Sequence, residues 1–268
     1  MSYKEEEYFI ANQKLWDQKT HAHVDSDFYN MEAFLAGESS LRKIELAELP
    51  DLKGLSVLHS QCHFGQDTLS LQRMGAQCTG IDFSEEAIKK ARDLNSQLGL
   101  DTRFVSTNVY DIDKHLSEQF DLVFTSYGVL GWLPDLDRWA KQMVARIKPS
   151  GLFYMAEFHP TMYMYDWETY KLDYPYFHEE VPTMEVESGT YADKQANISM
   201  KEYFWQHHLS DILTALLDNG LEILSFQEYD FSPYPIFGKE IKRAEQEYLF
   251  QKNGINLPLV FSIKAQKK

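Results

Sequence analysis

The sequence predicts a doubly wound α/β fold in which helices cover both faces of a seven-stranded, mostly parallel sheet. Three observations predict it. Short apolar or β-branched runs alternate with amphipathic helical patterns through the middle of the chain. The run at residues 120–125 is apolar almost throughout, as in strands that are covered on both faces. Hydrophobic residues make up 44% of the 268 residues, which is enough for one buried sheet with an added segment.

Turn and capping residues separate the predicted elements. Gly75 ends the first helix of the core, and Ser84 is a good N-cap for the second, with acidic residues following where the helix dipole favours negative charge. Pro134 lies near the start of the third helix. The predicted strands are residues 55–59, 77–81, 103–106, 120–125, 152–158, 221–229 and 259–264, and the predicted helices are residues 65–74, 85–98, 134–147 and 208–219.

The remaining segments predict two additions to this core. Residues 1–50 show helical patterns and no strand, so we expect an N-terminal helical arm that acts as a lid. Between residues 161 and 206 the periodicity fails, and Tyr, Pro and Glu are frequent. We therefore expect a cap inserted at residues 161–206 after the fifth strand, with the core formed by residues 51–160 and 207–268.

A formal net charge of −15 restricts the partners that the sequence favours. An acidic surface repels phosphate backbones and anionic headgroups, so we expect a small-molecule substrate, no nucleic acid and no membrane partner. The sequence leaves open whether the protein forms a homodimer. No apolar stretch approaches the length of a membrane span, and the acidic start does not resemble a signal peptide. With only two cysteines, Cys62 and Cys78, these features favour a cytoplasmic location.

The segment from His59 to Asp67 joins the first strand to its helix, where open α/β sheets bind nucleotide-like ligands. A dinucleotide requires glycines that let the backbone approach its pyrophosphate, and this loop has only Gly65. The second strand ends near Asp82, whose carboxylate can accept two hydrogen bonds from a ribose diol, and Phe83 offers an apolar surface for adenine. An acid in this place is as often a helix cap or a solvated residue, but its setting favours adenosine without a diphosphate.

Five segments, in this order, resemble motifs of the class I S-adenosylmethionine-dependent methyltransferases. Residues 57–65 stand where that family has an apolar strand and an acid-x-Gly-x-Gly-x-Gly loop, and residues 80–84 resemble its ribose-binding motif. Residues 108–111 match its adenine-contacting segment, while residues 120–126 and 147–151 resemble its fourth motif and the turn before strand five. The resemblance implies a Rossmann-like methyltransferase fold with S-adenosylmethionine as cofactor. It implies cofactor contacts from Gln61, His63, Gly65, Asp82, Phe83, Asn108, Val109 and Ser126.

The loop also departs from the family pattern. His59, Gln61 and His63 replace the usual acid and two glycines, and Asn108 stands where aspartate is common. Either the loop accepts the methionine portion of the cofactor with added polar contacts, or it has lost the cofactor. Residues 61–65 resemble a subgroup with a Gln-Cys-His-x-Gly loop. Because Gly65 and the acidic motif remain, we favour the first interpretation.

Three side chains are candidate catalytic groups because each follows a core strand or precedes the next helix: Tyr127, His159 and His207. Methyl transfer is an in-line displacement that depends on alignment, and it needs a general base only if the nucleophile arrives protonated. The alternative role of each histidine is a hydrogen bond to a loop carbonyl. The pair His207 and His208 suggests a metal site, but adjacent residues of an extended chain point to opposite faces. No cysteine or carboxylate completes a metal set with His59 and His63, so we expect no metal.

Aromatic residues in the covering segments are candidates for substrate contact, with core packing as their alternative role: Trp132, Tyr203 and Trp205. The N-terminal arm adds the lid candidates Trp16, His23, Phe28 and Tyr29. The leading prediction is therefore S-adenosylmethionine-dependent methyl transfer to a small-molecule oxygen or nitrogen. A cofactor-binding protein of the same fold without catalysis is the alternative, and an NAD-dependent oxidoreductase is disfavoured by the missing glycines.

Overall fold

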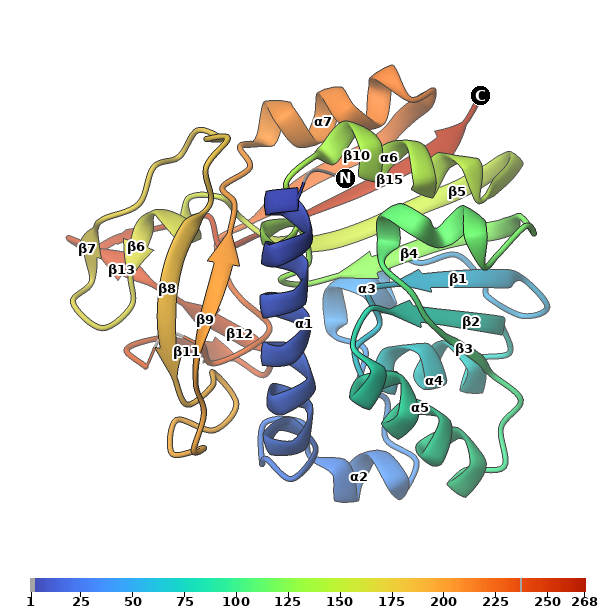
Figure 1. Cartoon of the computed structure of the whole chain (residues 1–268), viewed down its shortest axis with the longest axis horizontal. Helices are drawn as coiled ribbons and strands as arrows, with labels where there is room; N and C mark the ends of the chain where they lie inside the picture. The colour runs from blue at the N-terminus through green and yellow to red at the C-terminus, as the bar shows by residue number, and fades with distance from the viewer. Residues whose placement is uncertain (1–2, 237) are drawn as a thin grey trace.

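The structure, a computed structural model, describes residues 3–236 and 238–268 (Figure 1). Seven strands form its central sheet: β1 (Ser56–Ser60), β2 (Gln77–Asp82), β3 (Arg103–Ser106), β4 (Phe120–Ser126), β5 (Ile147–Phe158), β10 (Leu221–Tyr229) and β15 (Val260–Lys267). Their order is β10-β15-β5-β4-β1-β2-β3. Only β15 runs antiparallel to its neighbours β5 and β10 among these seven. The predicted fold class is confirmed.

Helices cover both faces of this sheet: α4 (Gln66–Arg73), α5 (Glu85–Gln97), α6 (Leu136–Ala145) and α7 (Leu209–Asp218). Val57 and Leu58 are adjacent in β1 and therefore point to opposite faces. Val57 belongs to the apolar cluster that contains Leu71 of α4, whereas Leu58 belongs to the cluster that contains Trp139 of α6 and Leu216 of α7. Burial on both faces explains why the core strands are apolar almost throughout.

Local sequence determines where the helices begin. The Ser84 hydroxyl accepts a hydrogen bond from the N–H of Ala87 at 3.1 Å, which confirms the predicted N-cap of α5. Asp135 caps α6 by accepting from the N–H of Arg138 at 3.0 Å. The third helix was predicted to reach residue 147, but α6 ends at residue 145 and β5 already begins at Ile147, which pairs with the first residue of β4.

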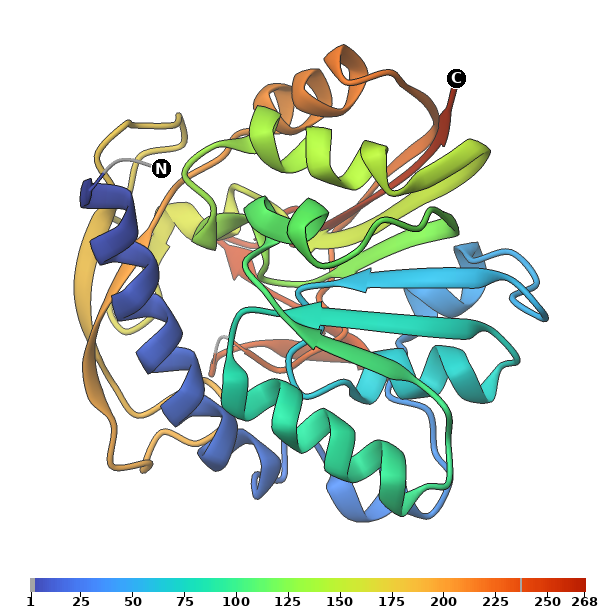
Figure 2. The same ribbon diagram turned by 45° about the vertical axis from the view of Figure 1, so that its right-hand side comes forward.

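The N-terminal arm consists of α1 (Tyr3–Val24), α2 (Met31–Leu35) and α3 (Lys43–Glu48). In Figures 1 and 2, α1 stands between the sheet and the remaining strands, and the arrowheads of β1, β2 and β3 point toward it. Gln13 donates to the carbonyl of Phe83 at 2.6 Å, next to the end of β2. On the other side of α1, Asn12 donates to the carbonyl of Tyr203 at 2.8 Å and accepts from its N–H at 2.9 Å.

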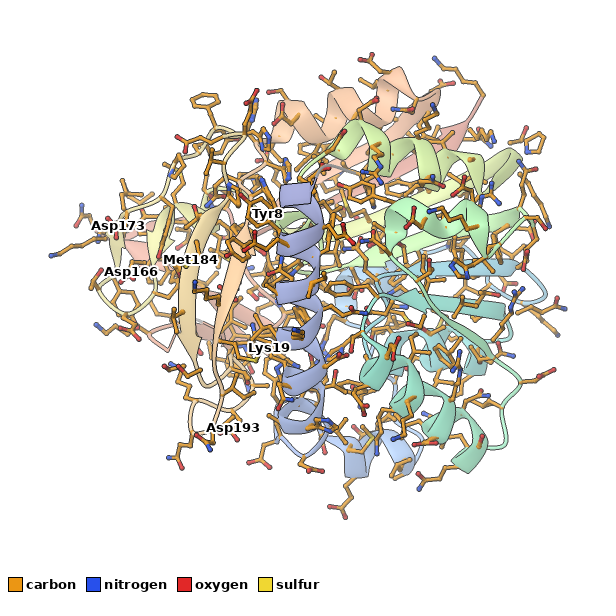
Figure 3. The ribbon with its side chains drawn as sticks, in the orientation of Figure 1. Tyr8, Lys19, Asp166, Asp173, Met184 and Asp193 are labelled. Carbon is orange, nitrogen blue, oxygen red and sulfur yellow. The ribbon has the colours of Figure 1, made fainter. Side chains whose placement is uncertain are left out.

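The segment predicted as a cap contains β6 (Tyr165–Asp166), β7 (Lys171–Leu172) and the antiparallel pair β8 (Thr183–Ser188) and β9 (Ser199–Phe204). The short 3-10 helix Met162–Met164 precedes β6. Met184 and Val186 of β8 are 50% and 58% exposed, and Figure 3 labels Met184. Because these apolar side chains are exposed, the alternation along β8 does not mark a buried face, and the sequence pattern did not predict the strand.

Residues 230–236 and 238–258, which were predicted to be part of the core, lie outside the central sheet. They contain β11 (Ile241–Ala244) with β12 (Glu247–Leu249) and β13 (Gln251–Lys252) with β14 (Ile255–Asn256). Tyr229 pairs with Val260, so the chain leaves the sheet after β10 and returns directly beside it in β15. Phe250 then packs on Trp167, with ring centroids 5.2 Å apart.

Within residues 3–236 and 238–268, no helix has the length and apolar character to cross a membrane.

Candidate active site

A cavity of about 830 Å³ lies where the carboxyl ends of the central strands face α1 and the cap. Ligands of open α/β sheets bind at this end of the strands. The volume falls in the range of pockets that enclose small organic ligands. Every residue predicted to contact a cofactor lines the cavity: Gln61, His63, Gly65, Asp82, Phe83, Asn108, Val109 and Ser126.

Asp82 anchors the loop between β1 and α4. Its Oδ2 accepts a hydrogen bond from the N–H of His63 at 2.8 Å, and its Oδ1 accepts one from the N–H of Ser84 at 2.9 Å. Desolvation raises the pKa of Asp82 to about 6, partly offset by these N–H donors. The carboxylate is therefore mainly ionised at neutral pH. Each oxygen keeps a second lone pair that can accept a hydrogen bond from a ligand.

The loop has a glycine-like backbone at two positions without glycine. Gln61 has φ of 57° and His63 has φ of 50°, both in the left-handed region that glycine enters most easily. Gly65 has φ of 81°, and a Cβ added there would lie 2.8 Å from the ring of Phe104 and 3.0 Å from Ala91. Packing therefore requires glycine at residue 65, whereas residues 61 and 63 keep side chains.

The side chains of Gln61 and His63 cross the loop to other segments. Gln61 Nε2 donates to the carbonyl of Val129 at 2.9 Å, and His63 Nε2 lies 2.9 Å from His23 Nδ1. Burial lowers the pKa of His63 to about 3 and that of His23 to about 2, so both rings are neutral at pH 7. Among the described residues, Gln61 Oε1 and His63 Nδ1 are buried without a hydrogen-bond partner. A bound ligand can satisfy such atoms.

Asn108 and Ser126 border the same space from β3 and β4. Asn108 accepts from the N–H of Tyr110 at 3.0 Å and thereby caps the 3-10 helix Val109–Lys114. Ser126 Oγ lies 3.3 Å from Oδ2 of Asp67, a residue of the first turn of α4. Val109 is 5% exposed and adds apolar surface. The site thus combines a polar loop with an apolar wall.

Tyr127 is the one predicted catalytic residue that lines the cavity. Its hydroxyl donates to Glu45 Oε2 at 2.9 Å. Burial, with a contribution from Asp67, raises the pKa of Glu45 to about 7. Burial also raises the pKa of Tyr127 well above its usual value, with Glu45 adding to the shift. The pair therefore holds its proton on the phenol and has a carboxylate of near-neutral pKa beside it.

His159 and His207 do not line the cavity, contrary to the predicted catalytic roles. His159 Nε2 lies 2.9 Å from Glu228 and its Nδ1 lies 2.9 Å from Thr161, so both ring nitrogens are engaged. His207 Nε2 lies 2.7 Å from the carbonyl of Leu133. His207 makes the carbonyl contact that was the alternative to catalysis, whereas His159 is held by the side chains of Glu228 and Thr161, and we assign neither to the reaction.

Of the predicted substrate contacts, Trp132 lines the cavity, whereas Tyr203 and Trp205 do not. Alternate residues of a strand point to opposite faces. Glu202 and Phe204 of this stretch line the cavity. Tyr203 instead packs on Tyr8 of α1, with ring centroids 4.5 Å apart. Trp205 is 2% exposed and also contacts Tyr8, at 5.7 Å. Figure 3 labels Tyr8 and Lys19 on α1, beside β9.

Comparisons with known proteins bear on this site. Residues 58–153 match the methyltransferase domain family. The ubiquinone biosynthesis O-methyltransferase of Coxiella burnetii is 31% identical over 105 residues, which cover 39% of this chain and 44% of that protein. The protein of the same name from Xanthomonas oryzae is 33% identical over 113 residues, with coverage of 41% and 46%. The chain therefore spans less than half the length of these curated relatives.

Solved structures extend the likeness beyond this segment. An S-adenosylmethionine-dependent methyltransferase from Mesorhizobium loti aligns with a TM-score of 0.56 and 20% identity, covering 87% of this chain and 100% of that one. The DhpI–SAH complex aligns with a TM-score of 0.57 and 14% identity, covering 97% of both chains. At these identities the structural likeness concerns the fold. The core of the chain therefore has the fold of S-adenosylmethionine-dependent methyltransferases, and residues 58–153 match the methyltransferase domain family.

Three of the four lid candidates line the cavity, namely Trp16, Phe28 and Tyr29, and Lys19 of α1 lines it too. Trp16 lines the cavity and meets the ring of Trp132 edge-on at 5.3 Å, whereas His23 lies behind His63. Lys19, which was missed, lies 5.2 Å from the Trp16 ring and 3.4 Å from Glu202. The i, i+3 spacing of Trp16 and Lys19 on one helix is the signal that could have found it.

Two further groups were missed by the sequence analysis because their partners are distant in sequence. Arg42 lines the cavity with its guanidinium 4.5 Å above the ring of Tyr234. Glu157, at the end of β5, accepts from the N–H groups of Val129 at 2.8 Å and Leu130 at 3.2 Å. Glu157 therefore shapes the loop that follows β4.

Membership in the Gln-Cys-His-x-Gly subgroup stays a prediction.

Proposed function

We propose that the chain transfers the methyl group of S-adenosylmethionine to a small-molecule acceptor. The observation that carries the proposal is one cavity that joins the Asp82 end of β2 to the inner surface of the cap. Both ligands of a methyl transfer have to meet in one enclosed space so that their reacting atoms align. The methyltransferase domain match over residues 58–153 supports the same function.

The residues present fit the cofactor, which supplies a methyl group bound to a sulfonium. Asp82 offers free carboxylate lone pairs for a ribose diol. Phe83 and Val109 supply apolar surface for a base. Gln61 Oε1 and His59 Nε2 are buried, belong to residues that line the cavity, and have no protein partner among the described residues. These two atoms are available to the polar amino-acid portion.

The acceptor occupies the part of the cavity that α1 and the cap enclose. Aromatic side chains are frequent there, among them Tyr163 and Phe204, whose centroids lie 5.1 Å apart. Such walls exclude water from the reacting atoms. The curated relatives are named as O-methyltransferases, which supports an oxygen nucleophile. The net charge of −15 favours a small acceptor over a nucleic acid, and the free cysteines favour a cytoplasmic location.

A hydroxyl acceptor has to lose its proton, and Tyr127 with Glu45 can take it. In this step the acceptor proton moves to Tyr127 Oη while the Tyr127 proton moves to Glu45 Oε2, 2.9 Å away. The bound cofactor would supply the methyl group to the acceptor oxygen and would leave as the neutral thioether. No free phenolate is formed, in keeping with the raised pKa of Tyr127. Glu45, with a pKa of about 7, suits a proton acceptor at neutral pH.

Calorimetry with S-adenosylmethionine, S-adenosylhomocysteine and NAD tests the cofactor assignment. We expect both sulfur nucleosides to bind and NAD not to bind. Binding of neither sulfur nucleoside would show that the proposed function is wrong. If both bind but no labelled methyl group reaches any compound in a broad set of hydroxyl and amine acceptors, the alternative of a cofactor-binding protein without catalysis gains support.

The Tyr127–Glu45 step has its own test. Tyr127→Phe should slow methyl transfer by about 10²–10⁴-fold, the usual contribution of general base catalysis, while the affinity for S-adenosylhomocysteine stays unchanged. Tyr154→Phe is the matched control, because the Tyr154 hydroxyl donates to Glu48 at 2.8 Å and Tyr154 does not line the cavity. Equal losses of turnover and cofactor affinity in Tyr127→Phe would assign Tyr127 to packing.

A further inference from the structure

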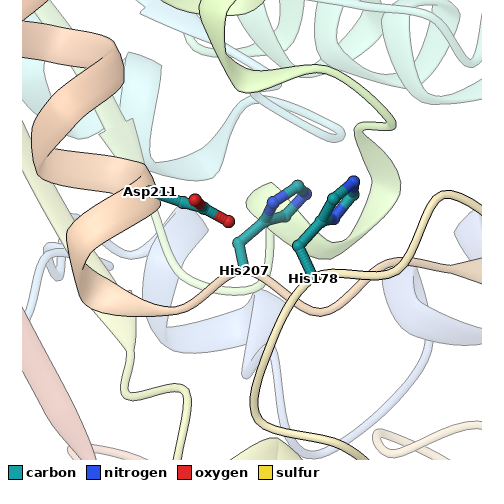
Figure 4. A group of neighbouring side chains, drawn as sticks. All are labelled: His178, His207 and Asp211. Atoms are coloured by element: carbon teal, nitrogen blue, oxygen red, sulfur yellow. The ribbon is translucent and has the colours of Figure 1, made fainter.

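Three potential metal ligands meet outside the cavity, where the cap contacts α7. His178 belongs to the segment between β7 and β8, His207 directly precedes α7, and Asp211 lies in its first turn. One ligand atom from each residue lies within 4.8 Å of the others. Figure 4 shows the Asp211 carboxylate pointing toward the His207 ring, with the His178 ring on the other side of it. None of the three lines the large cavity.

Backbone carbonyls determine which nitrogen of each ring is free. His207 Nε2 lies 2.7 Å from the carbonyl of Leu133, and only a protonated nitrogen can donate to that oxygen. His178 Nδ1 lies 3.0 Å from the carbonyl of Gln206. The lone pairs are therefore on Nδ1 of His207 and Nε2 of His178. Metal-binding histidines typically donate their other N–H to a carbonyl in this way.

Asp211 approaches the His207 ring, because one ligand atom of each residue lies within 4.8 Å of the other. Asp211 also lies 2.9 Å from Nδ1 of His208. Because His207 Nε2 donates to Leu133, the Nδ1 lone pair is left on a ring toward which the Asp211 carboxylate points (Figure 4). Two acceptors that face each other repel, and a cation between them removes the repulsion.

We propose that His178, His207 and Asp211 bind a divalent transition ion of the zinc class, which fastens the cap to α7. Two imidazole nitrogens and one carboxylate oxygen suit zinc and its first-row neighbours, whereas magnesium and calcium prefer oxygen ligands. A water molecule completes a four-coordinate ion.

The geometry also indicates that the ion and the cap move together. The rings of His178 and His207 are stacked, with centroids 4.8 Å apart and planes inclined by 12°, so their lone pairs run side by side. The ion is seated when the His178 ring turns toward Asp211, and the cap segment follows it. Gln206 transmits this movement, because its carbonyl accepts from His178 and its Nε2 donates to the carbonyl of Tyr163 at 2.9 Å. Gln206 and Tyr163 both line the large cavity.

The test measures zinc binding directly, without reference to methyl transfer. The full chain is stripped with a chelator, and Zn²⁺ is titrated in competition with a chromophoric chelator. We expect one high-affinity zinc per chain. His178→Gln and Asp211→Asn should each weaken this binding by more than about 100-fold, since loss of an outer partner alone costs 10–100-fold. His115→Gln is the matched control, because His115 is exposed and belongs to a different surface.

Two additional measurements separate a loss of zinc binding from a loss of folding. Far-UV circular dichroism and S-adenosylhomocysteine calorimetry on the zinc-free variants show whether they are folded, and Asp211→Asn changes only a half-exposed side chain. Zinc should slow proteolysis of the segment around residue 178 in the wild type and in His115→Gln, but not in the other two variants. Equal zinc affinity in folded His178→Gln, Asp211→Asn and the wild type would overturn the proposal, as would the absence of zinc binding to the wild type.

Discussion

Replacing Asp82, the last residue of β2, by alanine should weaken cofactor binding more than any single change in the loop between β1 and α4. The change removes the acceptor that we assign to the ribose diol, and it also removes the partner of the His63 and Ser84 N–H groups, at 2.8 and 2.9 Å. A hydrogen bond to an ionised group is worth about 1.5–3 kcal/mol. Two such bonds correspond to about 3–6 kcal/mol, or a rise in the dissociation constant of about 10²–10⁴-fold.

The same substitution should lower stability, so the assay has to separate binding from folding. Each backbone N–H left without a partner costs about 1–3 kcal/mol of unfolding free energy. Calorimetry with S-adenosylhomocysteine measures the affinity, and urea unfolding followed by circular dichroism measures the stability. Both are recorded at a temperature well below the unfolding transition, where the variant is folded.

Asp121→Ala is the control for this experiment. Asp121 accepts from the N–H of Ser56 at 2.8 Å and from its hydroxyl at 2.6 Å, at the opposite end of the sheet and away from the cavity lining. Asp121→Ala should therefore lose stability and keep its affinity for S-adenosylhomocysteine. If Asp82→Ala is folded and binds S-adenosylhomocysteine as tightly as the wild type, the assignment of Asp82 to the ribose is refuted.

Three other expectations follow from the same contacts. Desolvation raises the pKa of Asp82 to about 6, and a bound diol favours its ionised form, so calorimetric affinity should fall by up to about tenfold per pH unit below that value; a flat profile would contradict this. Gly65→Ala should cost about 2–5 kcal/mol in urea unfolding, because its Cβ would lie 2.8 Å from Phe104 at a φ of 81°, and wild-type stability would disprove the packing argument. Asn12→Ala leaves both backbone groups of Tyr203 without this partner, so amide exchange at Tyr203 should accelerate; unchanged protection would show that Asn12 does not hold the helix.

The core could be predicted from sequence because its signals are local. The N-cap Ser84 and the glycine after the first core helix define element ends within a few residues, and the predicted β3 agrees with the structure at both ends. The cap could not be predicted in the same way. The apolar residues Met184 and Val186 are exposed on β8, and its pairing with β9 joins segments whose sequence patterns do not indicate a buried face.

The candidate site also contains residues that local sequence could predict and residues that it could not. Asp82 and Gly65 follow directly from their places after strands that are covered on both faces, and the structure puts both at the cavity. His159 occupies an equivalent place after β5, but its nitrogens are engaged by Glu228 and Thr161, and Glu228 belongs to a strand far along the chain. Lys19 pairs with Glu202 across an even longer separation in sequence, 183 positions. Such long-range partners decide which polar residue faces a ligand.

The position of α1 has a consequence for the rate of turnover. Gln13 fastens this helix to the end of β2, and Asn12 fastens it to β9, so one helix is bonded to both walls of the cavity. Widening the gap between those walls stretches or breaks one of the two attachments. For the proposed methyl transfer, a product that leaves between these walls requires α1 to detach from one of them, so substitutions that weaken either attachment should change the rate of product release.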